Sequence, residues 1–231
     1  MYPMLNQPFL RGIYAITDAN LLPDDTRLQE AAESAMRGGL KLLQYRDKTA
    51  DASKALRQTR LLADLCLSYE CQLIINDDPE LAKACEAAGV HLGQSDSNLR
   101  HARELLGQEA IIGSTCHNSL QLASQAALSG ASYLAFGRFF PSSTKPDAPA
   151  ADLNIFKLAE HLGLPTLAIG GIRVEHLPLL ARAGAAMVAS VASIFDQPCP
   201  EEAVRNFRKA FEPTLPFTSH EALNDTLRRS I

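Results

Sequence analysis

The stretch MRGGLKLLQYRDK (36–48) decides the fold, because it contains the parts of one structural unit in order. A helix ends, two glycines turn the chain, an apolar strand follows, and polar residues come after the strand. Similar phrases recur at EAAGVHLG (86–93), LSGASYLAFG (128–137) and RAGAAMVAS (182–190). Glycine readily supplies the left-handed cap at the end of a helix. The sequence therefore predicts a repeated helix–turn–strand unit.

Short apolar runs alternate with segments of helical periodicity along the whole chain. Runs that are apolar nearly throughout suit parallel strands covered on both faces. Asp51 and Ser119 are predicted helix N-caps, and Gly38–Gly39 and Gly130 are predicted helix stops. The predicted strands are GIYAIT (12–17), LKLLQY (40–45), QLIIN (72–76), GVHLG (89–93), AIIGST (110–115), SYLAFG (132–137), PTLAIGG (165–171) and AMVASV (186–191).

Eight strands that alternate with helices favour a closed parallel barrel over an open sheet. We therefore predict an α/β fold, a single (β/α)₈ TIM barrel, in one domain over residues 1–231. The barrel is expected at about 12–211, with its eighth helix at about 201–211 and a short tail at 212–231. The length of 231 residues fits, since such barrels typically have about 250 residues.

The composition is that of an ordinary globular protein. Hydrophobic residues make up 46% and charged residues 21% of the chain, and the formal net charge is −4. This charge argues against a nucleic-acid binder, because such proteins carry a basic face. No run approaches the roughly 18 apolar residues of a membrane helix, and residues 1–11 do not resemble a secretory signal. The five cysteines lack zinc-ligand spacing and are interpreted as reduced thiols. We expect a cytoplasmic protein that binds neither nucleic acid nor membrane.

Polar side chains collect where the predicted strands end, which in a parallel barrel is the functional face. Arg46 and Lys48 follow the second strand, and Lys145 follows the sixth. Arginine and lysine at such positions are suited to phosphate oxygens. Solvated loop charge is the alternative for each residue alone, but three cations at one barrel mouth predict an anion site.

Two carboxylates follow neighbouring predicted strands, Asp77 after the third and Asp96 after the fourth. Carboxylates beside a bound phosphate, without a His or Cys partner, suit a hard ion such as Mg²⁺. The alternative is local, since Asp77 could start a turn before Pro79 and Asp96 could cap the next helix. The cations nearby favour the metal site.

Gly170 and Gly171, after the seventh strand, and the turn after the eighth lie where barrels bind phosphate through backbone N–H groups. No Ser-His-Asp or Cys-His order is evident. Cys116 and His117 are adjacent on a strand and so would point to opposite faces. The residues together predict a site for a diphosphate and a monophosphate, with a metal ion that stabilises a diphosphate leaving group.

Seven motifs occur in one order at barrel spacing. They are Y-A-I-T-D (14–18), Q-Y-R-D-K (44–48), I-I-N-D-D (74–78), V-H-L-G-Q-S-D (90–96), I-I-G-S-T-C-H-N (111–118), P-S-S-T-K (141–145) and A-I-G-G-I (168–172). Through them the chain, from Gly12 to about Phe211, resembles the thiamine phosphate synthase family. The resemblance implies a transferase that joins 4-amino-2-methyl-5-pyrimidinylmethyl diphosphate to a thiazole phosphate. Thiamine phosphate and diphosphate are the products, and one Mg²⁺ serves each site.

The resemblance also implies the roles of individual residues. The pyrimidine diphosphate would be held by Gln44, Tyr45, Arg46, Asp47, Lys48, Asn76 and Lys145. The metal would be held by Asp77 and Asp96. The thiazole phosphate would be held by Ser142, Ser143, Thr144, Gly171, Val191 and Ala192. The catalytic residues would be Arg46, Lys48, Lys145 and Thr115, whose hydroxyl would lie beside the reacting centre.

The implied mechanism is dissociative, so the C–O bond to diphosphate breaks before the thiazole nitrogen captures a pyrimidinylmethyl cation. Thr115, Ser142 and Ala192 stand where the family more often has Ser, Thr and Ser. The first two substitutions keep a hydroxyl, so we expect activity to survive. The third keeps only the backbone N–H.

Two other functions remain open at this point. A thiazole tautomerase on the same barrel would isomerise a thiazole carboxylate phosphate, but it has no use for a diphosphate or Mg²⁺. A non-catalytic barrel could have kept the phosphate pocket for ligand binding or regulation. A homo-oligomer is compatible with the sequence, which does not decide the oligomeric state.

Overall fold

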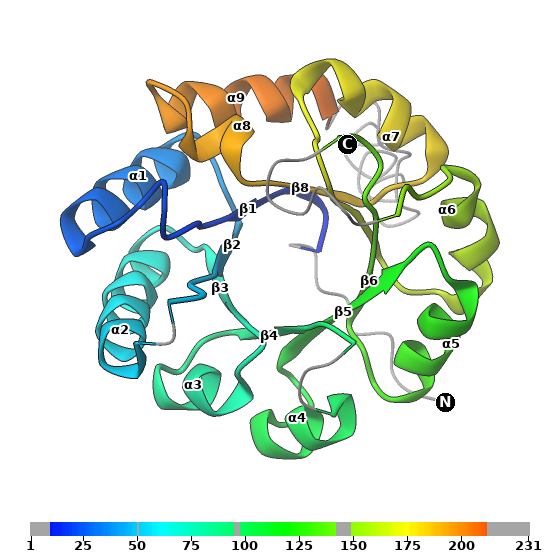
Figure 1. Ribbon diagram of the computed structural model, residues 1–231, viewed down its shortest axis with the longest axis horizontal. Helices are drawn as coiled ribbons and strands as arrows, with labels where there is room; N and C mark the ends of the chain where they lie inside the picture. Colours follow the sequence, from blue (N-terminus) through cyan, green and yellow to red (C-terminus); the bar gives the residue numbers. More distant parts are fainter. Residues whose placement is uncertain (1–9, 50, 95–97, 142–148, 212–231) are drawn as a thin grey trace, which may run out of the picture.

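The computed structural model describes residues 10–49, 51–94, 98–141 and 149–211. Eight parallel strands pair in chain order and close into a barrel, which confirms the predicted TIM barrel (Figure 1). The strands are β1 (Gly12–Ile16), β2 (Leu42–Tyr45), β3 (Gln72–Asn76), β4 (Gly89–Leu92), β5 (Ile111–His117), β6 (Tyr133–Phe136), β7 (Thr166–Ala168) and β8 (Met187–Ser190).

Helices form a ring outside the barrel (Figure 1). They are α1 (Asp25–Arg37), α2 (Ala52–Ser68), α3 (Pro79–Ala84), α4 (Leu99–Leu106), α5 (Leu120–Leu128), α6 (Asn154–Ala159), η1 (Glu160–Leu162), η2 (Val174–His176), α7 (Leu177–Ala183), α8 (Ala192–Phe195) and α9 (Pro200–Phe211). Asp51 and Ser119 cap α2 and α5 as predicted. The predicted eighth helix is α9, and the short α8 between β8 and α9 was not foreseen.

The strand β7 is shorter than the predicted run 165–171. Gly170 and Gly171 lie at φ 102° and 62°, in left-handed conformations that strands do not use. The chain therefore leaves the sheet after Ala168, and the two glycines become part of the loop at the barrel mouth.

Alternation along each strand divides the core into two layers. Leu43 and Tyr45 of β2 point outward into the large apolar layer between the strands and the helices. Leu42 points inward, into a smaller cluster that fills the barrel. Gln44 also points inward and hydrogen-bonds Tyr14 of that inner cluster. This division decides which polar residues can reach the lumen.

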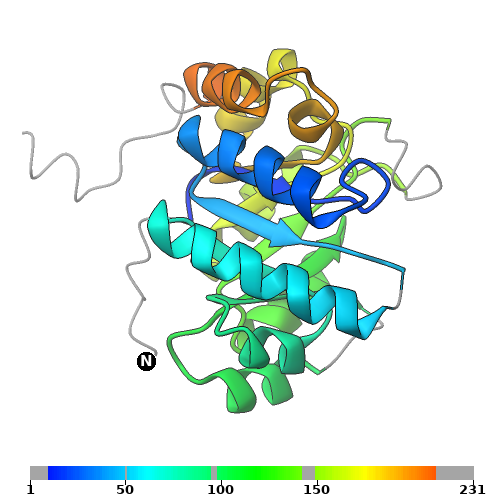
Figure 2. The same ribbon diagram turned by 90° about the vertical axis from the view of Figure 1, so that its left-hand side faces the viewer.

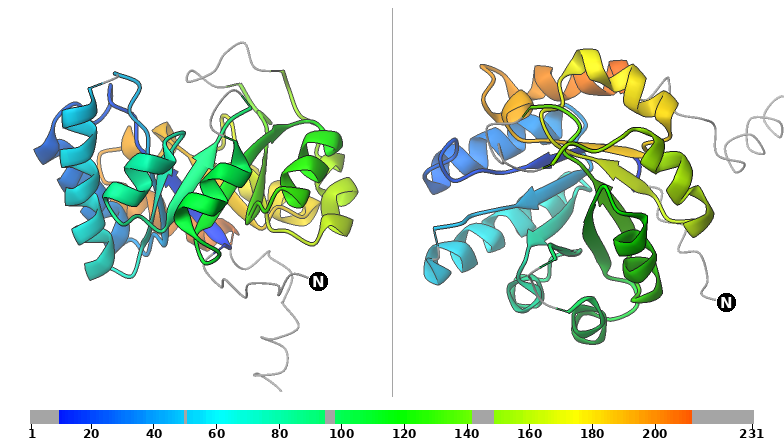
Figure 3. Two further views of the ribbon diagram at one scale, coloured as in Figure 1. Left: turned by 90° about the horizontal axis from the view of Figure 1, so that it is seen from below. Right: turned by 45° about the vertical axis from the view of Figure 1, so that its right-hand side comes forward.

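The ring closes where β1 pairs with β8 and α9 packs beside α1 (Figures 2 and 3). Arg37 Nε of α1 donates to Glu201 Oε2 of α9 at 3.2 Å. Ser34 Oγ accepts from the backbone N–H of Glu201 at 3.1 Å. Among the described residues, none of the helices has both the length and the apolar character needed to cross a bilayer.

Arg103 of α4 fastens the end of the barrel where the strands begin. Its guanidinium donates to the carbonyl oxygens of Ala110 at 2.6 Å and Gly130 at 2.8 Å, and to Ser132 Oγ at 3.0 Å. It also donates to the carbonyl oxygens of Gly107 and Gln108, both at 3.0 Å. Two helix-to-strand turns are thereby joined through one side chain.

Candidate active site

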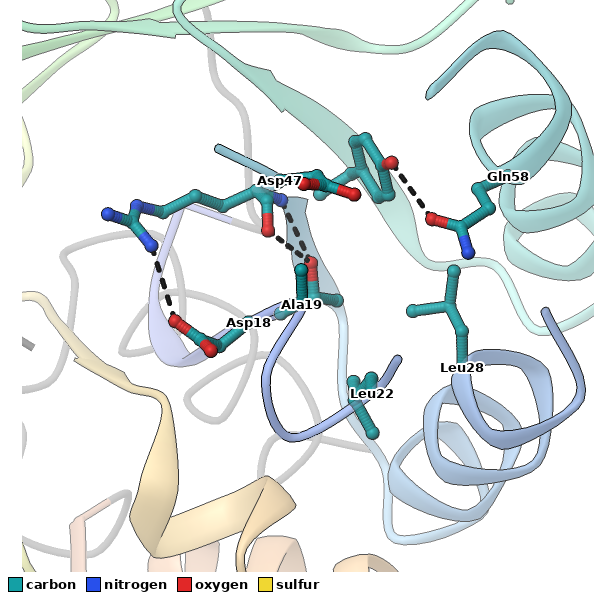
Figure 4. A pocket seen from close by; sticks show the side chains of 9 residues that line it. Asp18, Ala19, Leu22, Leu28, Asp47 and Gln58 are labelled. Atoms are coloured by element: carbon teal, nitrogen blue, oxygen red, sulfur yellow. Dashed lines mark hydrogen bonds and ion pairs between the residues drawn. The ribbon is translucent and has the colours of Figure 1, made fainter. Parts of the chain in front are cut away.

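Arg46 leaves the end of β2 and is held at the barrel mouth by the end of β1. Its backbone N–H donates to Thr17 Oγ1 at 2.8 Å, and its Nη1 lies 3.4 Å from Asp18 Oδ2. Figure 4 shows this ion pair ending on Asp18. Both side chains are largely shielded from solvent, so the pair is weakly screened. At 3.4 Å the contact is long for a charge-assisted hydrogen bond, and an incoming anion can compete for the guanidinium.

Lys48 and Asp77 form a second cation–carboxylate pair, between the ends of β2 and β3. Asn76 Nδ2 also donates to Asp77 Oδ2, at 2.6 Å. Asp77 has φ 68°, a left-handed conformation that is rare outside glycine. Its neighbour Asp78 caps α3 by accepting from Leu81 N at 2.9 Å. Asp77 thus lies in the turn before Pro79, as the local alternative predicted, and Asp78 provides the helix cap. The Asp77 carboxylate nevertheless faces the Lys48 cation and the Asn76 amide.

Gln44 and Thr115 meet the polar interior of the barrel. Gln44 Nε2 donates to Tyr14 Oη at 2.9 Å, and Thr115 Oγ1 lies 2.9 Å from His91 Nε2. Gln94 donates to the backbone carbonyl of Thr115. Both residues are thus placed by side chains from other strands.

The two backbone turns after β7 and β8 lie against each other. Ser193 Oγ donates to the carbonyl of Ile172 at 2.8 Å and so joins the turns. A Cβ on Gly171 would lie 2.1 Å from the carbonyl oxygen of Pro141, so no other residue fits there. Val191 and Ala192 begin α8. The structure therefore brings Gly171, Val191 and Ala192 into one region of the mouth.

The structure does not bring the side chains of Tyr45 and Asp47 to this group. Tyr45 points outward, as its place in the strand requires, and donates to Gln58 Oε1 at 2.9 Å. Asp47 accepts from Thr49 N at 2.7 Å and pairs with Lys54 Nζ at 3.0 Å. Both side chains brace the loop after β2 against α2, and they line a shallow depression beside Thr17 and Asp18 (Figure 4).

Some predicted site residues lie outside the described residues. They are Asp96, Ser142, Ser143, Thr144 and Lys145. The part of the chain that the structure describes contains no group of three or more His, Cys, Asp or Glu side chains placed to hold a metal ion. Of the two predicted metal ligands, Asp77 alone lies in that part.

Three residues that form a polar core in the barrel were not predicted as part of the site. Tyr14, His91 and Tyr133 are buried, and they connect Gln44 to Thr115 by hydrogen bonds. A signal was present, since each is a polar residue in an otherwise apolar strand. Asp18, the partner of Arg46, was also missed, although it follows β1 where the predicted mouth begins.

Cys116 is excluded as a nucleophile by its surroundings. The side chain is fully buried in the outer layer, away from the lumen. Burial raises the pKa of the Cys116 thiol to about 12, so the reactive thiolate is absent at neutral pH. The prediction that Cys116 and His117 do not form a catalytic pair agrees with this placement.

Comparisons with known proteins agree with the motifs. The family model described as thiamine monophosphate synthase matches residues 13–194. A thiamine-phosphate synthase from Marinobacter nauticus is 51% identical over 210 residues, which cover 90% of this chain and 94% of that protein. A thiamine phosphate pyrophosphorylase structure from Pyrococcus furiosus has a TM-score of 0.82 at 28% identity, covering 91% of this chain and 100% of that one. A 3-hexulose-6-phosphate synthase structure, with a TM-score of 0.66 at 15% identity and coverage of 87% and 99%, shares the fold alone.

Proposed function

Because this chain belongs to the thiamine monophosphate synthase family and has thiamine-phosphate synthase activity, we propose that the charged barrel mouth carries out the reaction. In this proposal the substrates are a pyrimidine diphosphate and a thiazole phosphate. The observation that carries the proposal is the position of Arg46 and Lys48. Each cation follows β2 and already contacts a carboxylate, Asp18 or Asp77, at the same end of the barrel.

In this proposal Arg46, Lys48 and Lys145 bind the diphosphate of the pyrimidine substrate. Arginine offers a planar fork and lysine a point charge, and both match phosphate oxygens. Asn76 and Gln44 complete this part of the site from β3 and β2. The backbones of Tyr45 and Asp47 belong to the same segment, and their side chains hold that segment against α2.

Asp77 and Asp96 would hold one Mg²⁺. The donor chemistry at Asp77 fits, because hard oxygen ligands suit Mg²⁺ and the carboxylate already attracts the Lys48 cation. When bound, Mg²⁺ would supply positive charge to the diphosphate oxygens. Lys48 would then be available to bind the leaving diphosphate, because its present partner, Asp77, would bind the metal ion instead.

The thiazole phosphate would lie at the opposite side of the mouth. Ser142, Ser143 and Thr144 would contact its phosphate from the loop after β6, and Gly171, Val191 and Ala192 from the turns after β7 and β8. The contact between Ser193 and Ile172 supports this placement, since it keeps the two turns together. Helix starts and tight turns offer backbone N–H groups to phosphate.

The reaction breaks the C–O bond of the pyrimidine diphosphate, and its electron pair leaves with the diphosphate. Arg46, Lys48 and Lys145 stabilise the negative charge that develops there, which is often the largest contribution to catalysis. The thiazole nitrogen then gives its lone pair to the pyrimidinylmethyl carbon and forms the C–N bond. Thr115 positions the pyrimidine near this carbon, and no protein nucleophile takes part. Holding the thiazole nitrogen in line with the pyrimidinylmethyl carbon further lowers the barrier, because the two reactants are already positioned.

Charge variants test this proposal. Arg46→Gln and Lys48→Gln should each lower kcat by about 100-fold or more, comparable to the loss of an oxyanion donor. Arg57→Gln is the matched control, because Arg57 pairs with Asp25 between α1 and α2, outside the proposed site. Release of diphosphate in the presence of both substrates is the measurement. Equal rates for all three variants and the unmodified enzyme would contradict the proposal.

We also propose the cytoplasm as the compartment. All five cysteines are free thiols, and Cys199 is exposed. Unpaired thiols are typical of reducing compartments.

A further inference from the structure

A chain of hydrogen bonds crosses the interior of the barrel from β2 to β5. Gln44 Nε2 donates to Tyr14 Oη at 2.9 Å, and Tyr14 Oη lies 3.0 Å from Tyr133 Oη. Tyr133 Oη lies 2.9 Å from His91 Nδ1, and His91 Nε2 lies 2.9 Å from Thr115 Oγ1. We call these five side chains the lumen chain. It connects two residues of the proposed site through three that the reaction does not require.

The first link sets the direction of every other link. An amide nitrogen can only donate, so the Tyr14 oxygen accepts a hydrogen bond from Gln44. The Tyr14 O–H is then free to donate to the oxygen of Tyr133. The Tyr133 hydroxyl then accepts a hydrogen bond from Tyr14 and donates one to His91 Nδ1. A neutral His91 that accepts at Nδ1 carries its proton on Nε2 and donates to Thr115 Oγ1. The hydroxyl donors of Tyr14 and Tyr133 and the imidazole donor of His91 then each have an acceptor.

Burial favours an arrangement in which each of these hydroxyls is paired. Tyr14 and Tyr133 are fully buried, and burial raises the pKa of both hydroxyls, so they keep their protons. An unpaired buried hydroxyl is strongly disfavoured, so a mixed arrangement with one idle donor is unfavourable. Among the hydrogen bonds given for these five described side chains, the only other complete arrangement runs the opposite way and needs the Gln44 amide turned over. The structure has the Gln44 nitrogen on Tyr14.

The sequence makes room for this chain at Gly113 of β5. A Cβ at this position would lie 2.1 Å from Tyr133 Cζ and 2.5 Å from His91 Nδ1. The Tyr133 and His91 rings stack with centroids 5.6 Å apart and planes at 23°. A glycine weakens a strand, and it often marks a place where another group must approach the backbone closely. At Gly113 the approaching groups are the rings of Tyr133 and His91.

We propose that the lumen chain is a specificity device: it keeps Gln44 as an acceptor and Thr115 as a donor toward the substrates. One N–H of the Gln44 amide is used on Tyr14, which fixes the orientation of the amide and leaves its oxygen for the ligand. Thr115 Oγ1 accepts a hydrogen bond from His91 Nε2–H, which leaves its own O–H to donate to a ligand acceptor. Given the proposed function, Gln44 then accepts from the amino group of the pyrimidine. A pyrimidine with an oxo group in place of this amino group would set its oxygen against the amide oxygen of Gln44. Both groups are acceptors, so this pyrimidine is rejected.

The tautomer of His91 tests the direction without an activity assay. In the unmodified enzyme labelled with ¹⁵N-histidine, His91 should be neutral with its proton on Nε2. The His91 signals are identified by their absence from His91→Gln. A proton on Nδ1, or on both nitrogens, would overturn the proposed direction.

Tyr133→Phe tests the effect on specificity. The variant removes the acceptor of the Tyr14 proton, so Tyr14 can donate and the Gln44 amide can turn over. We expect kcat/KM for the aminopyrimidine diphosphate to fall by about 10- to 100-fold, as one or two lost buried hydrogen bonds predict. The kcat/KM for the 4-oxo analogue should not fall. The ratio of kcat/KM between the aminopyrimidine and the 4-oxo analogue should therefore decrease at least about tenfold.

Tyr69→Phe is the control. It also removes a hydrogen-bonded tyrosine hydroxyl, but that hydroxyl donates to Glu33 on the outside of the barrel. It should change neither rate nor discrimination. Equal losses for both substrates in Tyr133→Phe, or no loss, would overturn the lumen chain as a specificity device while the proposed function stands. An unmodified enzyme that forms no thiamine phosphate would instead overturn the proposed function.

Discussion

Two arginines, one at each end of the barrel, show how the same side chain serves stability in one place and chemistry in another. Arg103, where the strands begin, has its donors occupied by backbone carbonyls and Ser132. Within the part of the chain that the structure describes, the guanidinium of Arg46, where the strands end, makes one long contact, to Asp18. An arginine whose donors are filled by carbonyl oxygens of neighbouring loops has none left for a ligand. An arginine with a single weak partner can exchange it for a phosphate, and the barrel places such side chains at the mouth.

The largest effect is expected at the carboxylate of the mouth. Asp77→Ala should lower turnover by about 10³-fold, because a metal ion contributes several kcal/mol to transition-state stabilisation. Chelation by EDTA should do the same to the unmodified enzyme, and so should Asp96→Ala. The rate of thiamine phosphate formation is the measurement. Full activity in excess EDTA would remove Mg²⁺ from the account.

A smaller loss is expected at Lys145, which should act on the same diphosphate. Lys145→Ala should raise the barrier of the chemical step by about 2–4 kcal/mol, comparable with removal of an oxyanion donor. Single-turnover rates separate this step from binding. If the variant only bound the thiazole phosphate more weakly, Lys145 would belong to the other substrate.

The two arginines themselves should respond in opposite ways. Arg103→Ala should lower the free energy of unfolding by about 2–4 kcal/mol, because it leaves the partly buried carbonyls of Ala110 and Gly130 unpaired. Its kcat should remain unchanged at a temperature where the variant is folded. Arg46→Ala should lose activity with little change in Tm. Thermal unfolding and kcat, measured on both variants, test the contrast; a large Tm loss in Arg46→Ala with normal kcat would reverse it.

The sequence predicted the barrel and its mouth because both follow from local patterns. Apolar runs such as QLIIN (72–76) gave the strands, and the parallel arrangement places their ends together. The outward direction of Tyr45 follows from strand alternation, so the sequence already contained the signal that separates its side chain from those of Gln44 and Arg46. What the sequence could not decide is the pairing of side chains across the barrel. Asp18 and the lumen chain were missed because their partners lie many residues away.

The smallest effect is expected at Cys116. Because it lies in the outer layer with its thiol protonated, Cys116→Ala should keep kcat within about threefold; the lost packing should appear in Tm instead. Alkylation at pH 8 should modify the exposed Cys199 and leave Cys116 unmodified. A large loss of kcat in a folded Cys116→Ala would reopen a thiol mechanism.

The central claim is that the mouth of this barrel displaces diphosphate from the pyrimidine substrate with the thiazole nitrogen. The direct measurement is an assay of the purified protein with both substrates and Mg²⁺, in which both products are quantified over time. We expect thiamine phosphate and diphosphate in equal amounts, with no diphosphate released in EDTA. Binding of both substrates without either product, or isomerisation of a thiazole carboxylate phosphate in place of condensation, would contradict it.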